Sequence, residues 1–336
     1  MSKELEAKVK HHHVWEYYLK RWSENGSDIW YTTKTRKIAF DSPKGLAREN
    51  DFYKIKPLSK KHIRYIRTFI AQADKPIQDL NTSFLERIIR FQNVEALYIK
   101  SVPKVNEIDM HFNALKSNLL EDLHTGIEMS ARAILDELAL RNFSVLNEPK
   151  NMIAFCNYFG HQMSRTKSLK DKVFSNREYV GKNDIFKMLE ESWWCHSYMI
   201  GNNIGYSIYK ARKSENHCLF INDTNMPFIT SDQPIINAFK GLNDDVAPVT
   251  ENECDFYYPI SPSVAYMISG SKRFPRGEFN VTLDIVEEMN SKVAKNANVH
   301  IFGNARDSIK PFVKFVSIQK KNCEVYFYGV DRDVDK

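Results

Sequence analysis

The chain has 336 residues, 43% hydrophobic and 12% aromatic, enough to bury the core of one large or two modest domains. Lys and Arg number 48 against 42 Asp and Glu, and this net charge of +6 favours an anionic partner without identifying one. The five cysteines lie far apart without C-x-x-C spacing. This spacing argues against a disulfide framework or structural zinc and indicates reduced thiols.

The N-terminal residues 1–10 are charged and contain no apolar core of a signal peptide. No run of the chain approaches the roughly 18 apolar residues that a membrane-spanning helix needs. We therefore expect a cytosolic (cytoplasmic) protein with no membrane segment. Proline and glycine are dispersed and no repeat is present, so residues 1–336 are expected to form a single globular assembly.

The N-terminal part, residues 1–58, is predicted to be a small β element. A short amphipathic segment, Val14–Trp22, precedes the turn pair Asn25-Gly26. The following runs, 29–32 and 38–40, are rich in β-branched and aromatic residues, which is typical of a β-hairpin.

The middle of the chain, residues 59–212, is predicted to be helical. Apolar residues recur there at steps of three and four, the spacing of a core-facing helix surface. The pattern covers 62–140, 151–166 and 184–209.

The C-terminal part, residues 213–332, is predicted to be β-rich, because short apolar runs alternate with Asn, Asp, Pro, Ser and Gly. The predicted strands lie at 219–221, 228–230, 256–258, 264–268, 312–318 and 325–328. One helix over 283–296 interrupts them. The whole is predicted to be an α+β fold, with a helical middle packed on a mostly antiparallel sheet formed largely by the C-terminal third.

Three consecutive histidines, His11, His12 and His13, stand where the charged N-terminal segment meets an aromatic one. An imidazole at such a border could act as a general base or a metal ligand. Equally, it could satisfy a buried backbone carbonyl. His12 and His13 are taken as candidate catalytic residues.

In the segment 119–140, Glu121, His124, Glu128 and Arg132 recur at helical steps and border an apolar face. Glu128 is nearest that border, where a carboxylate has a perturbed pKa or is held by a cation such as Arg132. It is a candidate acid/base or metal ligand. The alternative is a solvated stripe of ion pairs.

Further along, Gln162, Arg165 and Thr166 follow the apolar face of a predicted helix. Arg offers a planar fork of donors and Gln adds an orientable one, so the pair suits a phosphate or another oxyanion. These three are candidate substrate-binding residues. Capping of neighbouring carbonyls is the alternative.

An acidic turn, Ser231-Asp232-Gln233, ends the apolar strand predicted at 228–230. Asp232 could cap its own turn or project into a cleft at the end of the strand. The turn at 258–262 contains Ser261 in a comparable position. Asn290 is an amide on a buried helix face and is expected to connect that helix to a loop. Asp232 is a candidate catalytic residue, and Ser231, Ser261 and Asn290 are candidate substrate contacts.

Several well-defined enzyme motifs are missing from the sequence. It has no G-x-x-x-x-G-K-[ST] phosphate loop, no G-x-G-x-x-G between strand and helix, no H-E-x-x-H and no G-x-S-x-G. The chemistry must therefore be argued from the dispersed polar residues.

Taken in order, these residues resemble the bacterial family catalogued as domain of unknown function 4238 over about residues 11 to 305. The segments that carry the resemblance are His12-His13-Val14 with Tyr18-Leu19, Ile127-Glu128, Gln162-x-x-Arg165-Thr166, 229–234, 258–262 and Asn290. The family commonly continues its histidine motif with Val-Pro and an aromatic residue, whereas this chain has Val14-Trp15-Glu16. The resemblance implies a bacterial cytosolic protein, with some family members looking like accessory or effector genes of anti-phage and mobile-element systems.

The leading hypothesis is a hydrolytic effector, specifically a metal-assisted nuclease acting on RNA or DNA. In this hypothesis Glu128 and Asp232 hold Mg or Mn or activate water, a histidine transfers protons, and Arg165 with Gln162 binds phosphate. One alternative is a non-catalytic subunit that binds or senses a partner. Another is hydrolysis or transfer at the glycosidic bond of a nucleotide. The expected partner is a nucleic acid or nucleotide, with a protein from the same defence locus as a further possibility.

Overall fold

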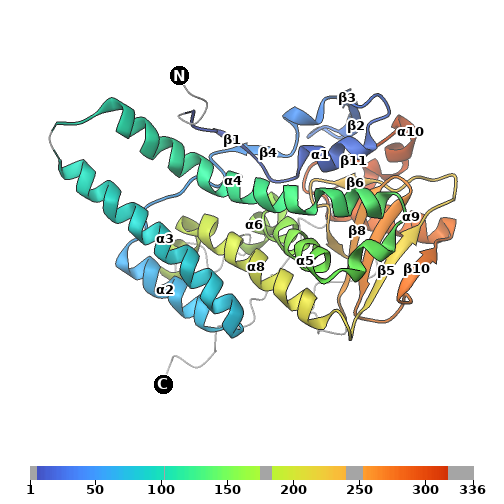
Figure 1. Ribbon diagram of the computed structural model, residues 1–336. Helices are drawn as coiled ribbons and strands as arrows, with labels where there is room; N and C mark the ends of the chain where they lie inside the picture. Colours follow the sequence, from blue (N-terminus) through green and yellow to red (C-terminus); the bar gives the residue numbers. More distant parts are fainter. Residues whose placement is uncertain (1–5, 102, 175–183, 240–252, 317–336) are drawn as a thin grey trace.

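The structure is a computed structural model that describes residues 6–101, 103–174, 184–239 and 253–316 (Figure 1). Its α-helices are α1 Glu16–Leu19, α2 Lys60–Ala71, α3 Lys75–Lys100, α4 Asn106–Ala139, α5 Pro149–Ser164, α6 Lys167–Phe174, α7 Asp184–Glu191, α8 Trp193–Ala211, α9 Leu283–Asn296 and α10 Arg306–Ile309. Its strands are β1 Lys10–His12, β2 Ile29–Thr32, β3 Ile38–Asp41, β4 Arg48–Asn50, β5 Asn216–Ile221, β6 Thr230–Ser231, β7 Ile236–Asn237, β8 Asp255–Ser261, β9 Val264–Ser269, β10 Gly277–Asn280 and β11 Ile301–Gly303. The predicted α+β class, with its helical middle, is confirmed.

A five-stranded sheet of order β10-β5-β9-β8-β7 is covered by helices on both faces. Along β8, Tyr258 belongs to the hydrophobic cluster of α4 and α5, whereas Tyr257 belongs to the cluster of α9. This alternation is the two-residue period of a strand. Because both faces are covered, β9 is buried throughout and its sequence is a continuous apolar run.

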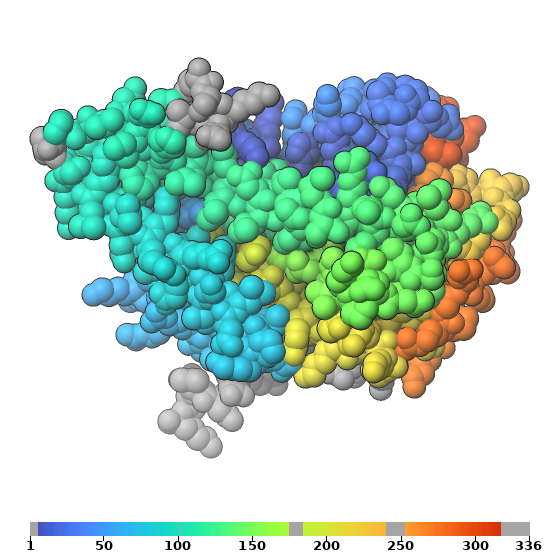
Figure 2. Space-filling view, in the orientation of Figure 1, coloured from blue at the N-terminus to red at the C-terminus, as the bar shows by residue number. Residues whose placement is uncertain are grey.

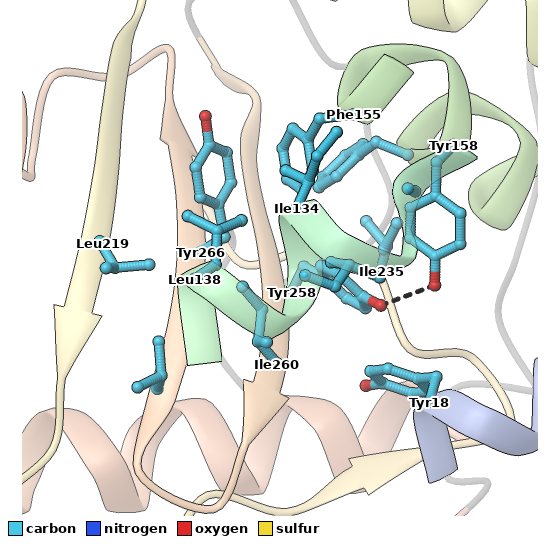
Figure 3. Packing of buried hydrophobic residues seen from close by; sticks show 14 of the residues in the cluster. Tyr18, Ile134, Leu138, Phe155, Tyr158, Leu219, Ile235, Tyr258, Ile260 and Tyr266 are labelled. Carbon is cyan, nitrogen blue, oxygen red and sulfur yellow. Dashed lines mark hydrogen bonds between the residues drawn. The ribbon is translucent and has the colours of Figure 1, made fainter. Parts of the chain in front are cut away.

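The face toward α4 and α5 is rich in aromatic side chains (Figure 3). The hydroxyls of Tyr158 on α5 and Tyr258 on β8 form a hydrogen bond of 2.8 Å. Tyr18 of α1 stacks on Tyr258 with ring centroids 5.2 Å apart and donates to Pro259 O. Each of these three buried phenols thus has a polar partner, which offsets the cost of burying its hydroxyl.

The N-terminal hairpin β2–β3 was predicted and is confirmed, but its sheet extends beyond the N-terminal part. The strand order β3-β2-β11-β6 places β11 between the hairpin and β6, so segments from both ends of the described chain share one sheet. Among the strand pairs of the described ranges, β5 and β10 run parallel and the others antiparallel. The prediction of a mostly antiparallel sheet is therefore confirmed.

One strand prediction was wrong. Residues Lys310–Phe315 form a 3-10 helix directly after α10, where a strand over 312–318 was predicted. Pro311 lies in its first turn and has no N–H for a β ladder, although its fixed φ suits a helical start. Residues 317–318 and the strand predicted at 325–328 lie outside the described residues.

Helices α5 and α8 pack at unusually close range through glycines. A Cβ atom built on Gly160 would lie 2.5 Å from Gly205 N and closer still to Gly201 O. Both neighbours are backbone atoms, which cannot move aside as the end of a flexible side chain can. The close approach of the two backbones therefore requires glycine at position 160.

We expect Gly160→Ala to lower the free energy of unfolding by roughly 3 kcal/mol or more, because α5 and α8 must separate to admit the methyl group. Gly126 on α4 is the matched control, since no atom lies within 4 Å of a Cβ built there. Gly126→Ala should stabilise the protein by about 0.5–1 kcal/mol through helix propensity. Urea denaturation of both variants measures this, and equal midpoints for the two would contradict the packing described.

The long helices α3 and α4 form a hairpin whose far end projects from the molecule, at the left in Figures 1 and 2. Its base packs with α2 and α8 around a second helical core that contains Ile66, Leu85, Leu120 and Met199. No helix in the described ranges is both long enough and apolar enough to cross a membrane.

Candidate functional site

Five of the candidate residues meet in one buried group, here called the Arg165 cluster: His13, Glu128, Gln162, Arg165 and Thr166. Arg165 Nη2 donates to Glu128 Oε1 in a short contact and to Gln162 Oε1 at 3.1 Å. Gln162 Nε2 in turn donates to the carbonyl of His13 at 3.2 Å. The side chain of Gln162 thus joins the end of β1 to the end of α5.

Local sequence explains part of this arrangement. Gln162 and Arg165 are three residues apart at the end of α5, so their side chains lie on neighbouring positions of one helix face. Thr166 follows Arg165 and immediately precedes α6, and its hydroxyl accepts from the backbone N–H of Leu169 at 3.3 Å. A Thr in this position is a favoured N-cap. The carbonyl of Arg165 accepts from the Tyr53 hydroxyl at 2.8 Å, which fixes the turn between the two helices.

Glu128 and Arg165 form an ion pair with side chains only 10% and 3% exposed. Burial raises the pKa of Glu128 above its ordinary value, and the Arg165 guanidinium opposes this without cancelling it. Burial alone would lower the pKa of Arg165, but Glu128 and two tyrosines hold it above its usual range. The cation beside Glu128 is therefore Arg165. Arg132, which the sequence suggested, instead lies over the Tyr17 ring at 4.3 Å.

His13 is 5% exposed and its pKa is lowered to about 3. Burial is the main cause, and the positive charges of Arg165 and Lys167 add to it. The imidazole is therefore neutral at pH 7. In the parts of the chain that the structure describes, neither His13 Nδ1 nor Arg165 Nε has a hydrogen-bond partner although both are buried. Other buried side-chain atoms in these ranges also lack a partner, for example Trp193 Nε1 and His196 Nε2, so this pair is distinguished by the cations beside it.

A basic rim, defined as Lys56, Lys167 and Lys170, adjoins the cluster. Lys170 Nζ lies 5.1 Å from the centroid of the Phe52 ring, and this ring is 5.9 Å from that of His13. Burial lowers the pKa of Lys170, and the charges of Lys167 and Lys56 lower it further. Lys167 is 37% exposed and pairs with Glu49 at 2.9 Å. Cations thus gather beside the two unpartnered buried nitrogens.

Asp232 makes its contacts with a backbone segment and not with the Arg165 cluster. Its carboxylate accepts backbone hydrogen bonds from Asn298 at 2.7 Å, Val299 at 2.7 Å and His300 at 3.0 Å. Burial raises the pKa of Asp232, while His300 and these three N–H groups oppose the rise. Of the two roles considered from sequence, neither describes this contact, because the carboxylate holds a distant segment rather than its own turn. Ser231 donates to Gln233 O at 2.8 Å within the turn.

Asn290 and Ser261 lie apart from the Arg165 cluster in their contacts. Asn290 Oδ1 accepts from Ile229 N and its Nδ2 donates to Pro227 O, each at 3.0 Å. This is the predicted connection from helix to loop. Ser261 Oγ accepts from Ser263 N at 3.4 Å in the turn between β8 and β9.

His12 is partly exposed, and its contacts differ from those of His13. Its Nε2 lies 3.3 Å from Lys44 O, and its backbone N–H donates to Glu121 Oε1 at 3.5 Å. His12 is the last residue of β1 and His13 follows it. His13 is the one whose pKa the Arg165 charge lowers.

Several residues of the site were not assigned a role from sequence. Gln233 accepts a hydrogen bond from Thr166 and donates to Ile235 O at 2.9 Å, which links the cluster to the Ser231–Gln233 turn. In the sequence, the place of Gln233 in the Ser231–Gln233 turn was the feature that could have marked it as a site residue. Lys167 had a comparable signal, since it directly follows Arg165-Thr166. Tyr53 had none, because its contact with Arg165 joins separate segments.

The acidic residues of the site are engaged in the contacts described above. No group of three or more metal-binding side chains from His, Cys, Asp or Glu occurs within the described ranges. Asp232 could hold an ion only by giving up backbone hydrogen bonds, and Glu128 only in competition with Arg165. This donor set does not fit an ion shared by the two carboxylates.

Comparison with known proteins gives one result. The family model described as "Protein of unknown function (DUF4238)" matches residues 10–309, which is most of the chain. No curated protein and no solved structure gives a significant match. The matched range contains the whole Arg165 cluster and the basic rim.

Proposed function

We propose, for a chain that belongs to the DUF4238 family, that the Arg165 cluster is the site of a hydrolase acting on a phosphate-containing substrate, a nucleic acid or a nucleotide. The observation that carries this proposal is the pair of buried, unpartnered nitrogens, Arg165 Nε and His13 Nδ1. A bound oxyanion would accept a hydrogen bond from Arg165 Nε and so give this nitrogen a partner. An anion is favoured because a guanidinium binds phosphate oxygens in a fork.

The basic rim supports the same substrate class. Lys56, Lys167 and Lys170 are close enough to one another to influence the pKa of Lys170. Such a group of cations attracts a polyanion and increases its rate of encounter with the site. Lys167 pairs with Glu49 at 2.9 Å and with Asp171 at 3.7 Å, so the three lysines of the rim outnumber the carboxylates paired with them.

The proposed chemistry uses residues of the cluster in distinct roles. Arg165 and Gln162 bind the phosphate and stabilise the charge that grows on it as water attacks phosphorus. Glu128, whose pKa burial raises, accepts a proton from that water. His13 relays the proton to the oxygen that departs as its bond to phosphorus breaks. The proton lost by water is thereby returned to the leaving group.

Magnesium or manganese would supply further charge stabilisation if the reaction uses one, and it remains a prediction from the sequence. The contacts of Asp232 and Glu128 do not support a shared ion, so no step of the proposal depends on it. Assays with and without each ion test this directly.

We expect Arg165→Lys to weaken binding of a labelled oligonucleotide by at least about tenfold, since a point charge cannot replace the guanidinium fork. The matched control is Arg132→Lys, because the Arg132 guanidinium lies over Tyr17 and has no contact with Glu128 in the described structure. Filter binding or fluorescence anisotropy gives the affinity, and a melting curve shows whether each variant is folded.

The variant Lys170→Ala tests whether the basic rim binds nucleic acid or only supports the fold. Its removal should leave the melting temperature nearly unchanged and reduce the salt dependence of nucleic-acid binding by about one charge. Unchanged affinity in a folded Arg165→Lys variant, together with an unchanged salt slope for Lys170→Ala, would overturn the proposal.

A second candidate function is favoured by the contacts of Asp232 and Asn290, which connect backbone segments and leave no group for a substrate. If the Arg165 cluster has the same purpose, the chain is a non-catalytic subunit that binds or senses a partner.

Glycosidic-bond cleavage is a third possibility, since it needs one carboxylate such as Glu128. Release of free base from a nucleotide distinguishes it from phosphate chemistry.

The cellular part of the proposal is an effector role in a bacterial anti-phage or toxin-like system, acting in the cytoplasm. It rests on the resemblance of the residue motifs. Expression of the chain in bacteria should then slow growth, whereas the Glu128→Gln variant, produced at an equal level, should not.

A further inference from the structure

The projecting end of the α3–α4 hairpin carries large apolar side chains exposed to solvent. Val94 and Leu97 on α3 are 57% and 71% exposed, and Ile108 and Leu115 on α4 are 38% and 48% exposed. We call these four residues the hairpin patch. Several large apolar side chains exposed on one element mark an interaction site more often than isolated exposed residues do.

Helix geometry places the residues of the hairpin patch on one side of the α3–α4 hairpin. The two helices face each other through Phe91, Tyr98 and Phe112, with ring centroids of 5.8 Å for Phe91–Phe112 and 5.3 Å for Tyr98–Phe112. At about 100° per residue, Val94 lies about 60° around its helix from Phe91, and Leu115 lies about 60° around from Phe112 in the same sense. Because the helices are antiparallel, both rotations lead to the same side of the hairpin.

The opposite side of the hairpin faces the body of the protein. Ile88 on α3 and Leu120 on α4 are rotated in the other sense, and both are fully buried in the second helical core. The hairpin patch therefore points away from the protein's own core. Among the described residues, no segment of the chain packs on it as a hydrophobic cluster.

Two unpaired charges flank the hairpin patch. Arg90 lies toward the base of α3, about 15 Å before its end at Lys100, and Glu107 lies near the tip in the first turn of α4. Both are exposed on the same side as the patch, and neither forms a salt bridge within the described ranges. A cation on one side of an apolar centre and an anion on the other make this surface complementary to itself.

We propose that two copies of the chain associate through the hairpin patch in an antiparallel, twofold-symmetric arrangement. A twofold axis through the patch would bring Glu107 of each copy opposite Arg90 of the other. The two hairpins would then form a four-helix bundle around Leu97 and its apolar neighbours. This inference is independent of the function proposed for the Arg165 cluster.

Sedimentation of the purified full chain tests the association. Wild type should dimerise at micromolar concentration, and Leu97→Glu should raise the dissociation constant by at least about 30-fold, because it places a charge at the centre of the interface. Leu140→Glu is the matched control. Leu140 is 76% exposed at the other end of α4, so this variant should dimerise as wild type does. Circular dichroism establishes that each variant is folded.

Charge reversal tests the pairing itself. Arg90→Glu and Glu107→Arg should each weaken the dimer by about tenfold, and the double variant should recover most of the loss. Recovery supports copy-to-copy contact, because a different partner could not be rescued by a change in the same chain. A wild type that stays monomeric at high micromolar concentration, or a double variant no stronger than the single ones, overturns the proposal.

Discussion

Acidification from about pH 7.5 to pH 5 should destabilise the protein by several kcal/mol, because five buried histidines are neutral in the folded chain. Burial lowers the pKa of each, to about 3 or about 4 where the shift is best defined. The five residues are His13, His124, His161, His196 and His217.

The direction of this pH effect on stability follows from how many protons the folded and unfolded chains bind. Between the ordinary pKa of 6.5 and the lowered values, the unfolded chain binds protons that the folded chain does not. Stability from these groups is therefore complete above pH 6.5 and is lost as the pH falls toward 4. By pH 5, each histidine with a folded-state pKa of about 3 or 4 has lost on the order of 2 kcal/mol of its stabilisation, so the summed loss approaches the whole stability of a typical domain. The raised pKa values of Glu128 and Asp232 act in the opposite direction and offset part of the loss.

Urea midpoints measured at several pH values give the proton uptake directly. His196→Gln should reduce that uptake by about one proton, because it removes one of the five neutral imidazoles. His111, which is exposed, is the control, and His111→Gln should leave the pH dependence unchanged. A midpoint that stays constant between pH 7.5 and 5 would show that the buried histidines titrate normally.

Asp232→Asn should lower the free energy of unfolding by roughly 2–4 kcal/mol, since the variant replaces a carboxylate that accepts three backbone hydrogen bonds. An amide keeps one oxygen acceptor and turns an NH2 group toward at least one backbone N–H. That buried donor is then left facing another donor, which is costly. The segment 298–300, and with it β11 in the four-stranded sheet, loses its attachment.

A thermal melt of Asp232→Asn beside Asp28→Asn measures this effect. Asp28 is an exposed aspartate whose hydrogen bonds are to neighbouring side chains, so its variant should melt close to wild type. If Asp232→Asn melts with wild type and has lost an activity, Asp232 is a cleft carboxylate and the contacts described for it are not its main role.

Local periodicity predicted the helices and the hairpin well, because these depend on residues close in sequence. The helix Leu283–Asn296 has the predicted limits, since its apolar residues recur at steps of three and four. The segment 312–318 shows where the same approach fails. Its apolar residues suit a strand, but Pro311 and the preceding α10 start a helical turn.

The site was predictable only in part, for a physical reason. The spacing of Gln162 and Arg165 predicted that they act together, and the border position of Glu128 predicted a perturbed pKa or an ion pair with a cation. The partner of each group could not be predicted, because Arg165 reaches Glu128 across 37 residues and Asp232 reaches Asn298 across 66. Contacts at such distances are set by how helices and strands pack, which residue spacing does not encode.

The central claim is that the Arg165 cluster acts on a phosphate-containing substrate, and one measurement tests it most directly. Purified wild type and Glu128→Gln are incubated with total RNA, plasmid DNA and a nucleotide pool, each with and without magnesium or manganese. We expect wild type to degrade at least one substrate at a phosphate bond, and Glu128→Gln, if folded, to lose about 100-fold or more of that rate. Intact substrates in every wild-type reaction, or equal cleavage by the variant, would contradict the claim.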